Sequence, residues 1–116
     1  MLRALVVAED MADTSSLDEI VRRIAEVAGP DRVILFGSHA RGDARPNSDY
    51  DLLIVGPSEL PRWRRTVALY AALSGVEAPY DLVWYTQAEL DDWAGVRSHF
   101  ATTAQREGQV LYEKPR

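Results

Sequence analysis

Hydrophobic residues along this chain recur with two spacings, one typical of helices and one typical of strands. Between residues 16 and 28 they fall three or four positions apart, which predicts an amphipathic helix that covers one side of a sheet. Ser16 and Glu19 have the spacing of a capping box at its start, and Gly29-Pro30 ends it. The apolar positions of this helix are Leu17, Ile20, Val21, Ile24, Val27 and Ala28.

Three apolar runs, at residues 32–36, 50–55 and 80–85, have the composition of strands. The loop between the first two is too short for a full parallel crossover, so we expect these strands to run antiparallel. A second helix is expected from Pro61, a favoured first helical position, to Ser74-Gly75. Because strand–helix–strand units cross over right-handed, the second and third strands should be parallel. The pattern predicts an α/β (α+β) fold, with helices packed on a small mixed β-sheet.

The last part of the chain is predicted to form one long helix. Thr86 and Glu89 have the spacing of a second capping box at its start, and Gly108 ends it. Residues 110–112 follow as a short apolar tail, either an edge strand or a segment that docks on a partner, with Tyr112 as a candidate interface residue. The apolar positions of the helix are Leu90, Trp93, Val96, Phe100, Ala101 and Ala104.

The N-terminal residues have no clear period, so a short strand and a mobile arm are both compatible with them. We therefore divide the chain into an N-terminal arm, residues 1–14, and one domain, residues 15–116. The apolar run at residues 2–8 is too short for a signal peptide, and no stretch approaches membrane-spanning length. We expect a cytoplasmic protein without membrane contact.

Composition narrows the possible chemistry. A chain of 116 residues, of which 47% are hydrophobic, is large enough for one domain with a real core. It has no cysteine, which excludes disulfides, thiolate metal sites and cysteine catalysis. Its formal net charge of −5 argues against general binding of nucleic acid.

A glycine follows the first predicted strand. Gly37 has no β-carbon, so another group can approach its backbone closely. If residues 37–41 turn into a short helix, their N–H groups point at whatever lies above the strand end, which favours a phosphate.

Two aspartates open the second predicted strand. Asp49 and Asp51 lie two positions apart, so they project from one face while Tyr50 and Leu52 face the other. The predicted topology brings Asp81, at the start of the third strand, to the same edge of the sheet as this pair and Gly37. Three neighbouring carboxylates repel one another unless a cation lies between them, and oxygen ligands suit Mg²⁺ or Mn²⁺.

These residues resemble the minimal nucleotidyltransferases (MNT) of the DNA polymerase β superfamily. The resemblance lies in Gly37-Ser38, an interval of ten residues, Asp49-x-Asp51 and the downstream carboxylate, and covers roughly residues 17–112. The short chain looks like the antitoxins of HEPN/MNT toxin–antitoxin pairs. It departs from the family at His39, where a basic residue is common, and at Tyr50, where an aliphatic one is common.

The resemblance implies a polymerase-β-like fold and a role for each motif residue. Gly37 and Ser38 would cradle the phosphates of the nucleotide, while Asp49 and Asp51 would bind the divalent ions. Asp81 would be the third carboxylate and assist removal of the acceptor proton. Arg41 would either clamp the developing phosphate charge or brace its own loop, and the residue pattern leaves both open.

The function implied is Mg²⁺-dependent transfer of AMP from ATP, with two ions, onto a tyrosine of a HEPN ribonuclease toxin encoded nearby. The chain has no room for the acceptor-binding domain of larger relatives, so we expect a partner protein and a hetero-oligomer. Two alternatives remain. One is nucleotidyl transfer to a small-molecule hydroxyl such as that of an aminoglycoside, and the other is an antitoxin that neutralises its partner by binding alone.

Several other residues have plain structural interpretations. We expect the three tryptophans to pack in the core or between helix and sheet. We expect His99 to be exposed on a helix. The arginines at positions 62, 64 and 65 are more often a solvated helix face than a contact for triphosphate or an acidic partner.

Overall fold

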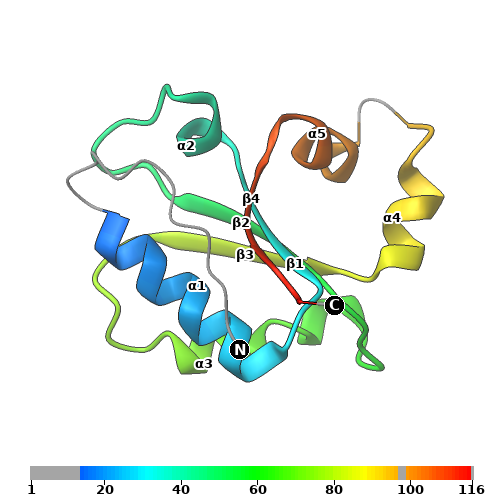
Figure 1. Cartoon of the computed structure of the whole chain (residues 1–116), viewed down its shortest axis with the longest axis horizontal. Coiled ribbons are helices and arrows are strands. Elements are labelled where there is room, and N and C mark those ends of the chain that lie inside the picture. Colours follow the sequence, from blue (N-terminus) through cyan, green and yellow to red (C-terminus); the bar gives the residue numbers. More distant parts are fainter. Residues whose placement is uncertain (1–13, 97–98, 116) are drawn as a thin grey trace.

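A computed structural model describes residues 14–96 and 99–115 of the chain. The expected N-terminal arm lies almost entirely outside these residues, so it stays a prediction. No helix in the described ranges is long and apolar enough to cross a membrane. The elements along the chain (Figure 1) are α1 (Thr14–Ala28), β1 (Arg32–Phe36), α2 (Ser38–Arg41), β2 (Tyr50–Val55), the 3₁₀ turn η1 (Arg62–Arg64), α3 (Val67–Ala72), β3 (Tyr80–Tyr85), α4 (Gln87–Trp93), α5 (Phe100–Glu107) and β4 (Gln109–Glu113).

The four strands form one mixed sheet in the order β3-β2-β1-β4. The antiparallel pairing of β1 with β2 and the parallel pairing of β2 with β3 are both confirmed. The apolar tail forms the edge strand β4, antiparallel to β1, with a register shift between Val33 and Ile34. Tyr112 is buried in the core, so its expected role at an exposed interface is wrong. The tail is therefore part of the sheet, through its pairing with β1.

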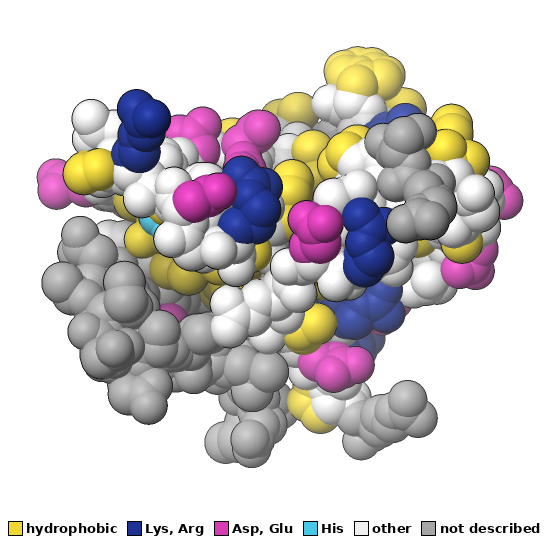
Figure 2. Space-filling view, turned by 90° about the horizontal axis from the view of Figure 1, so that it is seen from above, with side chains coloured by type: hydrophobic (Ala, Val, Ile, Leu, Met, Phe, Trp, Pro, Cys, Tyr) yellow, Lys and Arg dark blue, Asp and Glu magenta, His cyan; other side chains and the backbone are white. Residues whose placement is uncertain are grey.

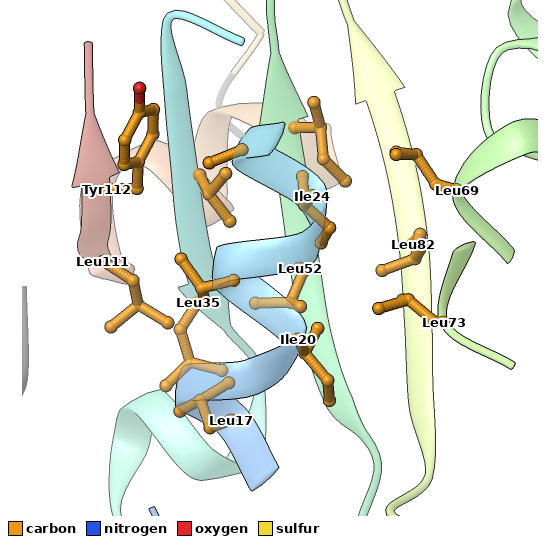
Figure 3. Close-up of a cluster of buried hydrophobic side chains, with 14 residues drawn as sticks. Leu17, Ile20, Ile24, Leu35, Leu52, Leu69, Leu73, Leu82, Leu111 and Tyr112 are labelled. Carbon is orange, nitrogen blue, oxygen red and sulfur yellow. The ribbon is translucent and has the colours of Figure 1, made fainter. Parts of the chain in front are cut away.

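Helices cover both faces of the sheet. On one face α1 and α3 pack on alternate strand residues. Figure 3 shows Leu17, Ile20 and Ile24 of α1 directed at the strands, and it shows Leu69 of α3 and the C-cap residue Leu73 beside β3. On the other face α5 and α4 cover the intervening strand residues, whose side chains point to that side of the sheet. This second core contains Ile34, Leu53, Val55, Tyr85, Leu90, Ala101 and Ala104.

The first helix is one turn longer than its pattern predicts. Because α1 begins at Thr14, Ser16 lies within the helix and cannot be its N-cap, so the first predicted capping box is wrong. The Glu19 carboxylate instead accepts hydrogen bonds from Arg22 and Arg23 on the next turn. Glu19 therefore forms (i, i+3) and (i, i+4) ion pairs within the helix.

The second predicted helix is also interrupted. Pro61 precedes the 3₁₀ turn η1, and α3 begins only at Val67. Trp63 lies in this turn and is 78% exposed, so its expected burial is wrong. Trp84 does pack as expected, against the core beneath α1 and α3, and its indole N–H donates to the Gly56 carbonyl. A helical spacing in the sequence does not distinguish α3 from the tighter turn before it.

The arginine cluster does not form a uniformly solvated face. Arg65 is buried and binds both carboxylate oxygens of Glu89, at 2.6 and 3.1 Å. Glu89 also completes the predicted capping box with Thr86, which is confirmed. One glutamate thus joins the start of α4 to the segment after β2.

The single long C-terminal helix is wrong, because the chain forms two shorter helices. Gly108 ends α5 as predicted. His99 is its N-cap: Nδ1 accepts a hydrogen bond from the backbone N–H of Ala101. Its ring stacks on Trp93 at 4.0 Å between centroids, so His99 is not the plainly exposed residue that was expected. A capping histidine at the break allows α4 and α5 to pack on the sheet at different angles (Figure 1).

Candidate active site

The glycine turn has the predicted form. β1 ends at Phe36, Gly37 adopts φ +76°, and the four-residue helix α2 follows at once. The first backbone hydrogen bonds of that helix are donated by Arg41 to the Gly37 carbonyl and by Gly42 to the Ser38 carbonyl. The N–H groups before Arg41 therefore lie ahead of the helical ladder, which is the position that suits an anion.

Gly37 is also required by its neighbour. A β-carbon on Gly37 would overlap Oδ2 of Asp51 and lie 3.1 Å from its Cγ. Phe36 is paired with Asp51 in the antiparallel register, which brings the end of β1 to the start of β2. The carboxylate thus occupies the space that the missing side chain leaves.

Asp51 lies between two further carboxylates. It is in register with Asp81 on the parallel strand β3, and Asp49 precedes it by two residues. Burial raises the pKa of Asp51, and the negative charges of Asp81 and Asp49 raise it further, while His39 and Arg41 oppose the shift. The register of β2 with β3 therefore confirms the prediction that Asp51 and Asp81 lie at the same end of the sheet.

A tyrosine within the second predicted helix, Tyr70, reaches Asp81. The hydroxyl of Tyr70, on α3, donates to Oδ1 of Asp81 at 3.3 Å and accepts from the N–H of Leu82 at 2.9 Å. Burial is the main cause that raises the pKa of Tyr70. The bond to Leu82 satisfies a backbone donor on the outer edge of β3. No signal in the sequence links Tyr70 to a strand eleven residues away.

The loop between α2 and β2 is held by its own side chains. Arg41 pairs with Asp43 at 3.3 Å on the surface, which is the bracing interaction considered for it. Nε2 of His39 lies 3.0 Å from the Ser48 carbonyl oxygen. The His39 ring packs on the Tyr50 ring, with 4.3 Å between the two ring centroids. Ser38 begins α2 and is partly buried.

The donor types at this edge suit a hard divalent ion, since all three are carboxylates and the chain has no cysteine. Among residues 14–96 and 99–115, no group of three His, Asp or Glu side chains is placed to hold a metal ion. Asp81 directs Oδ1 to Tyr70, while Asp51 faces the glycine turn. A metal site built from all three aspartates, and the assignment of each site residue, therefore stay predictions.

Acidic and basic side chains are interspersed over the face shown in Figure 2, and hydrophobic side chains gather toward its right-hand end. Among the described side chains on this face, charges of a single sign do not form one continuous field. Attraction of a polyanionic ligand would therefore depend on local groups such as the turn at Gly37, as the acidic net charge already indicates.

Comparison with known proteins identifies the family. The model of the nucleotidyltransferase domain family matches residues 16–112, most of the chain. A candidate protein adenylyltransferase of Methanocaldococcus jannaschii is 42% identical over 53 residues. That match covers 46% of this chain and 52% of the relative, so it spans about half of the curated protein.

Solved structures share the fold. A candidate nucleotidyltransferase from Sulfolobus solfataricus superposes with a TM-score of 0.61 at 23% identity, over 86% of this chain and 79% of that one. A toxin–antitoxin structure, a mutant of MntA–HpeT with two Asp→Glu substitutions, superposes with a TM-score of 0.50 at 21% identity, over 83% of this chain and 72% of that one. The polymerase-β-like fold expected from the sequence is confirmed.

Proposed function

The chain belongs to the nucleotidyltransferase domain family, and from that premise we propose that it is a Mg²⁺-dependent protein adenylyltransferase acting as an antitoxin. It transfers AMP from ATP to a tyrosine of a partner HEPN ribonuclease toxin. The observation that carries the proposal is the position of Asp51, which lies against the Gly37 turn and in register with Asp81. A phosphate-binding turn and repelling carboxylates at one sheet edge suit nucleotide chemistry.

Two comparisons favour a protein as the acceptor. The relative from Methanocaldococcus jannaschii is named as a candidate protein adenylyltransferase, and the matched segment is about half of that protein. The toxin–antitoxin structure has the same fold, which is the reason to propose a toxin as partner. The motif resemblance to stand-alone antitoxins agrees with both.

Each residue at the edge has a proposed role. The backbone N–H groups from Ser38 onward bind the triphosphate, and Arg41 can turn from Asp43 to a phosphate oxygen. Asp49 and Asp51 would hold Mg²⁺, which when bound neutralises phosphate charge and relieves the repulsion between the two carboxylates. Placing the nucleotide at a fixed turn orients its α-phosphorus for attack.

The transfer step is a displacement at the α-phosphorus. The tyrosine oxygen forms a bond to phosphorus, the bond from phosphorus to the bridging oxygen of the β-phosphate breaks, and pyrophosphate leaves. The phenolic proton passes to Asp81, whose carboxylate already accepts a phenolic hydrogen bond from Tyr70. The products are AMP-tyrosine and pyrophosphate.

The experiment is incubation with the adjacent gene product, Mg²⁺ and ATP labelled at the α-phosphate, followed by mass analysis. The partner should gain AMP on a tyrosine, and Asp49→Asn or Asp51→Asn should abolish the transfer. Asp92→Asn is the matched control, because Asp92 is an exposed aspartate on α4.

Other outcomes would contradict the proposal in distinct ways. Transfer of label from the γ-phosphate would identify a kinase. Label on small hydroxyl compounds without a second protein would favour the small-molecule alternative. If Asp49→Asn silenced the ribonuclease activity of the partner as fully as the unmodified chain, neutralisation by binding alone would be the better account.

A further inference from the structure

An exposed apolar stripe follows the segment between β2 and β3. Trp63 is 78% exposed, Val67 59% and Tyr70 39%. Val67 and Tyr70 lie three positions apart in α3, and Trp63 lies four positions before Val67 in the 3₁₀ turn η1, whereas Leu69 and Leu73 are buried. We call these three residues the Trp63 stripe. Apolar side chains grouped on a surface in this way mark interaction sites, whereas single ones do not.

The turn that carries Trp63 is fixed from beneath. The buried guanidinium of Arg65 donates to the carbonyls of Leu60 at 2.9 Å and Trp84 at 3.2 Å, and it also binds both carboxylate oxygens of Glu89. The exposed indole is therefore presented by a backbone that is already ordered. Ordering before contact lowers the entropic cost of association.

Positive charge borders the stripe. Arg62 and Arg64 flank Trp63 in η1, although the chain as a whole carries a formal net charge of −5. The Arg62 guanidinium lies 4.7 Å over the Tyr85 ring and 3.6 Å from Glu89. Arg64 is exposed and makes no ion pair within the described part of the chain. Tryptophan and arginine are the side chains most enriched at the energetic centres of protein interfaces.

The stripe leads to the candidate active site. In Figure 1 the chain returns along α3 to the start of β3. Tyr70, the last residue of the stripe, donates its hydroxyl hydrogen bond to Asp81 at 3.3 Å. A protein lying along the stripe is thereby brought to the sheet edge that carries the carboxylates. Trp63 itself follows the C-terminal end of β2, whereas Asp51 lies at the start of that strand.

We propose that the Trp63 stripe is the docking surface for the acceptor protein, and that this protein presents an apolar slot bordered by acidic side chains. The identity of the occupant rests on the proposed function. A protein is favoured over a nucleic acid as the occupant, because the stripe consists of exposed apolar side chains and the chain has an acidic net charge. Trp63 fills the slot, and Arg62 and Arg64 face its acidic border.

The test measures binding apart from chemistry. Affinity for the purified adjacent gene product is determined without ATP, with all variants made in an Asp51→Asn background. Trp63→Ala and Arg64→Glu should each weaken binding about tenfold or more. The controls are Val27→Ala, an exposed apolar residue on α1, and Arg106→Glu, an exposed arginine on α5; both should bind within about twofold of their parent.

A kinetic measurement with Asp51 intact adds a second readout. Trp63→Ala should raise the KM for the acceptor protein about tenfold and leave the KM for ATP unchanged, because Trp63 lies away from the Gly37 turn. Thermal melting checks that the variant is folded. A lowered kcat with an unchanged KM for the acceptor would overturn the proposal.

Three further results would overturn the docking surface. The first is that Trp63→Ala binds the partner as tightly as Val27→Ala does. The second is that the stripe variants lose only self-association, as measured by sedimentation. The third is that they lose binding to a single-stranded oligonucleotide and still bind the protein. The proposed function fails separately. Binding that depends on Trp63, without transfer of AMP, would leave the surface in place and remove the adenylyl transfer.

Discussion

The carboxylate of Asp51 occupies the space in which a side chain at residue 37 would lie, so Gly37 and Asp51 fit together only because one of them has no β-carbon. The contact joins the end of β1 to the start of β2. Residue 37 must therefore meet two requirements. It adopts φ +76°, and it must have no β-carbon, because a β-carbon there would overlap Asp51. A substitution there disturbs the backbone and the carboxylate together.

Gly37→Ala should therefore abolish nucleotidyl transfer and lower the free energy of unfolding by about 1–3 kcal/mol. Gly75→Ala is the control, because Gly75 has φ +91° with nothing within 4 Å of an added β-carbon. The control should cost about 1 kcal/mol and keep full activity. Urea denaturation and the transfer assay measure the two effects. Equal activity in the two variants would show that the contact with Asp51 is irrelevant to function.

Removing one of the gathered charges should stabilise the chain when no divalent ion is present. Asp51 is half-buried beside Asp49 and Asp81, so in EDTA the Asp51→Asn variant should melt at a higher temperature than the parent protein. Added Mg²⁺ should raise the melting temperature of the parent protein and have little effect on the variant. Asp92→Asn should respond to Mg²⁺ as the parent does. Equal stabilisation of Asp51→Asn by Mg²⁺ would place the ion elsewhere.

The pair of Arg65 and Glu89 should control stability in acid. The Arg65 guanidinium is the main cause that lowers the pKa of Glu89 to about 2, from 4.5 in the unfolded chain. A lowered carboxyl pKa gives stability that is present above pH 4.5 and lost as the pH falls toward 2. The shift corresponds to about 3 kcal/mol.

Glu89→Gln should remove that stability at neutral pH, about 3 kcal/mol or somewhat more, because it leaves a buried guanidinium without its counter-charge. It should also flatten the pH dependence of unfolding between pH 4.5 and 2. The control is Glu107→Gln, whose exposed pair with Arg106 should contribute less than about 0.5 kcal/mol. Denaturant titrations across this pH range test both. A similar loss in the two variants would argue against a buried ion pair.

His99 should act as a helix cap that an amide can replace. Its Nδ1 accepts from the Ala101 N–H, which requires that nitrogen to be unprotonated. His99→Ala should cost about 1 kcal/mol in unfolding free energy, and His99→Asn should recover part of it by supplying an acceptor. Chemical denaturation at pH 8 gives the comparison. Indistinguishable stabilities for the alanine and asparagine variants would assign the effect to the stacking on Trp93 instead.

Much of this protein is predictable from local sequence. The strands, their directions and the turn at Gly37 follow from the period of apolar residues, from loop length and from the one residue type that tolerates φ +76°. Asp51 and Asp81 were predicted to meet because strand directions alone decide which strand ends share an edge. Helix limits were less predictable, since Ser16 within α1 and the break before α5 depend on which backbone groups find partners.

The sequence by itself determined the alternation that buries one face of each strand, the directions of the strands, and the placing of Gly37 and the aspartates at a common edge, because period, chain length and the absence of a side chain are local properties. Only the tertiary structure decided that Arg65 is buried on Glu89, that Trp63 is exposed, that Tyr112 enters the core and that Tyr70 reaches Asp81. Those outcomes depend on which distant element lies against each side chain, and a linear pattern does not contain that information.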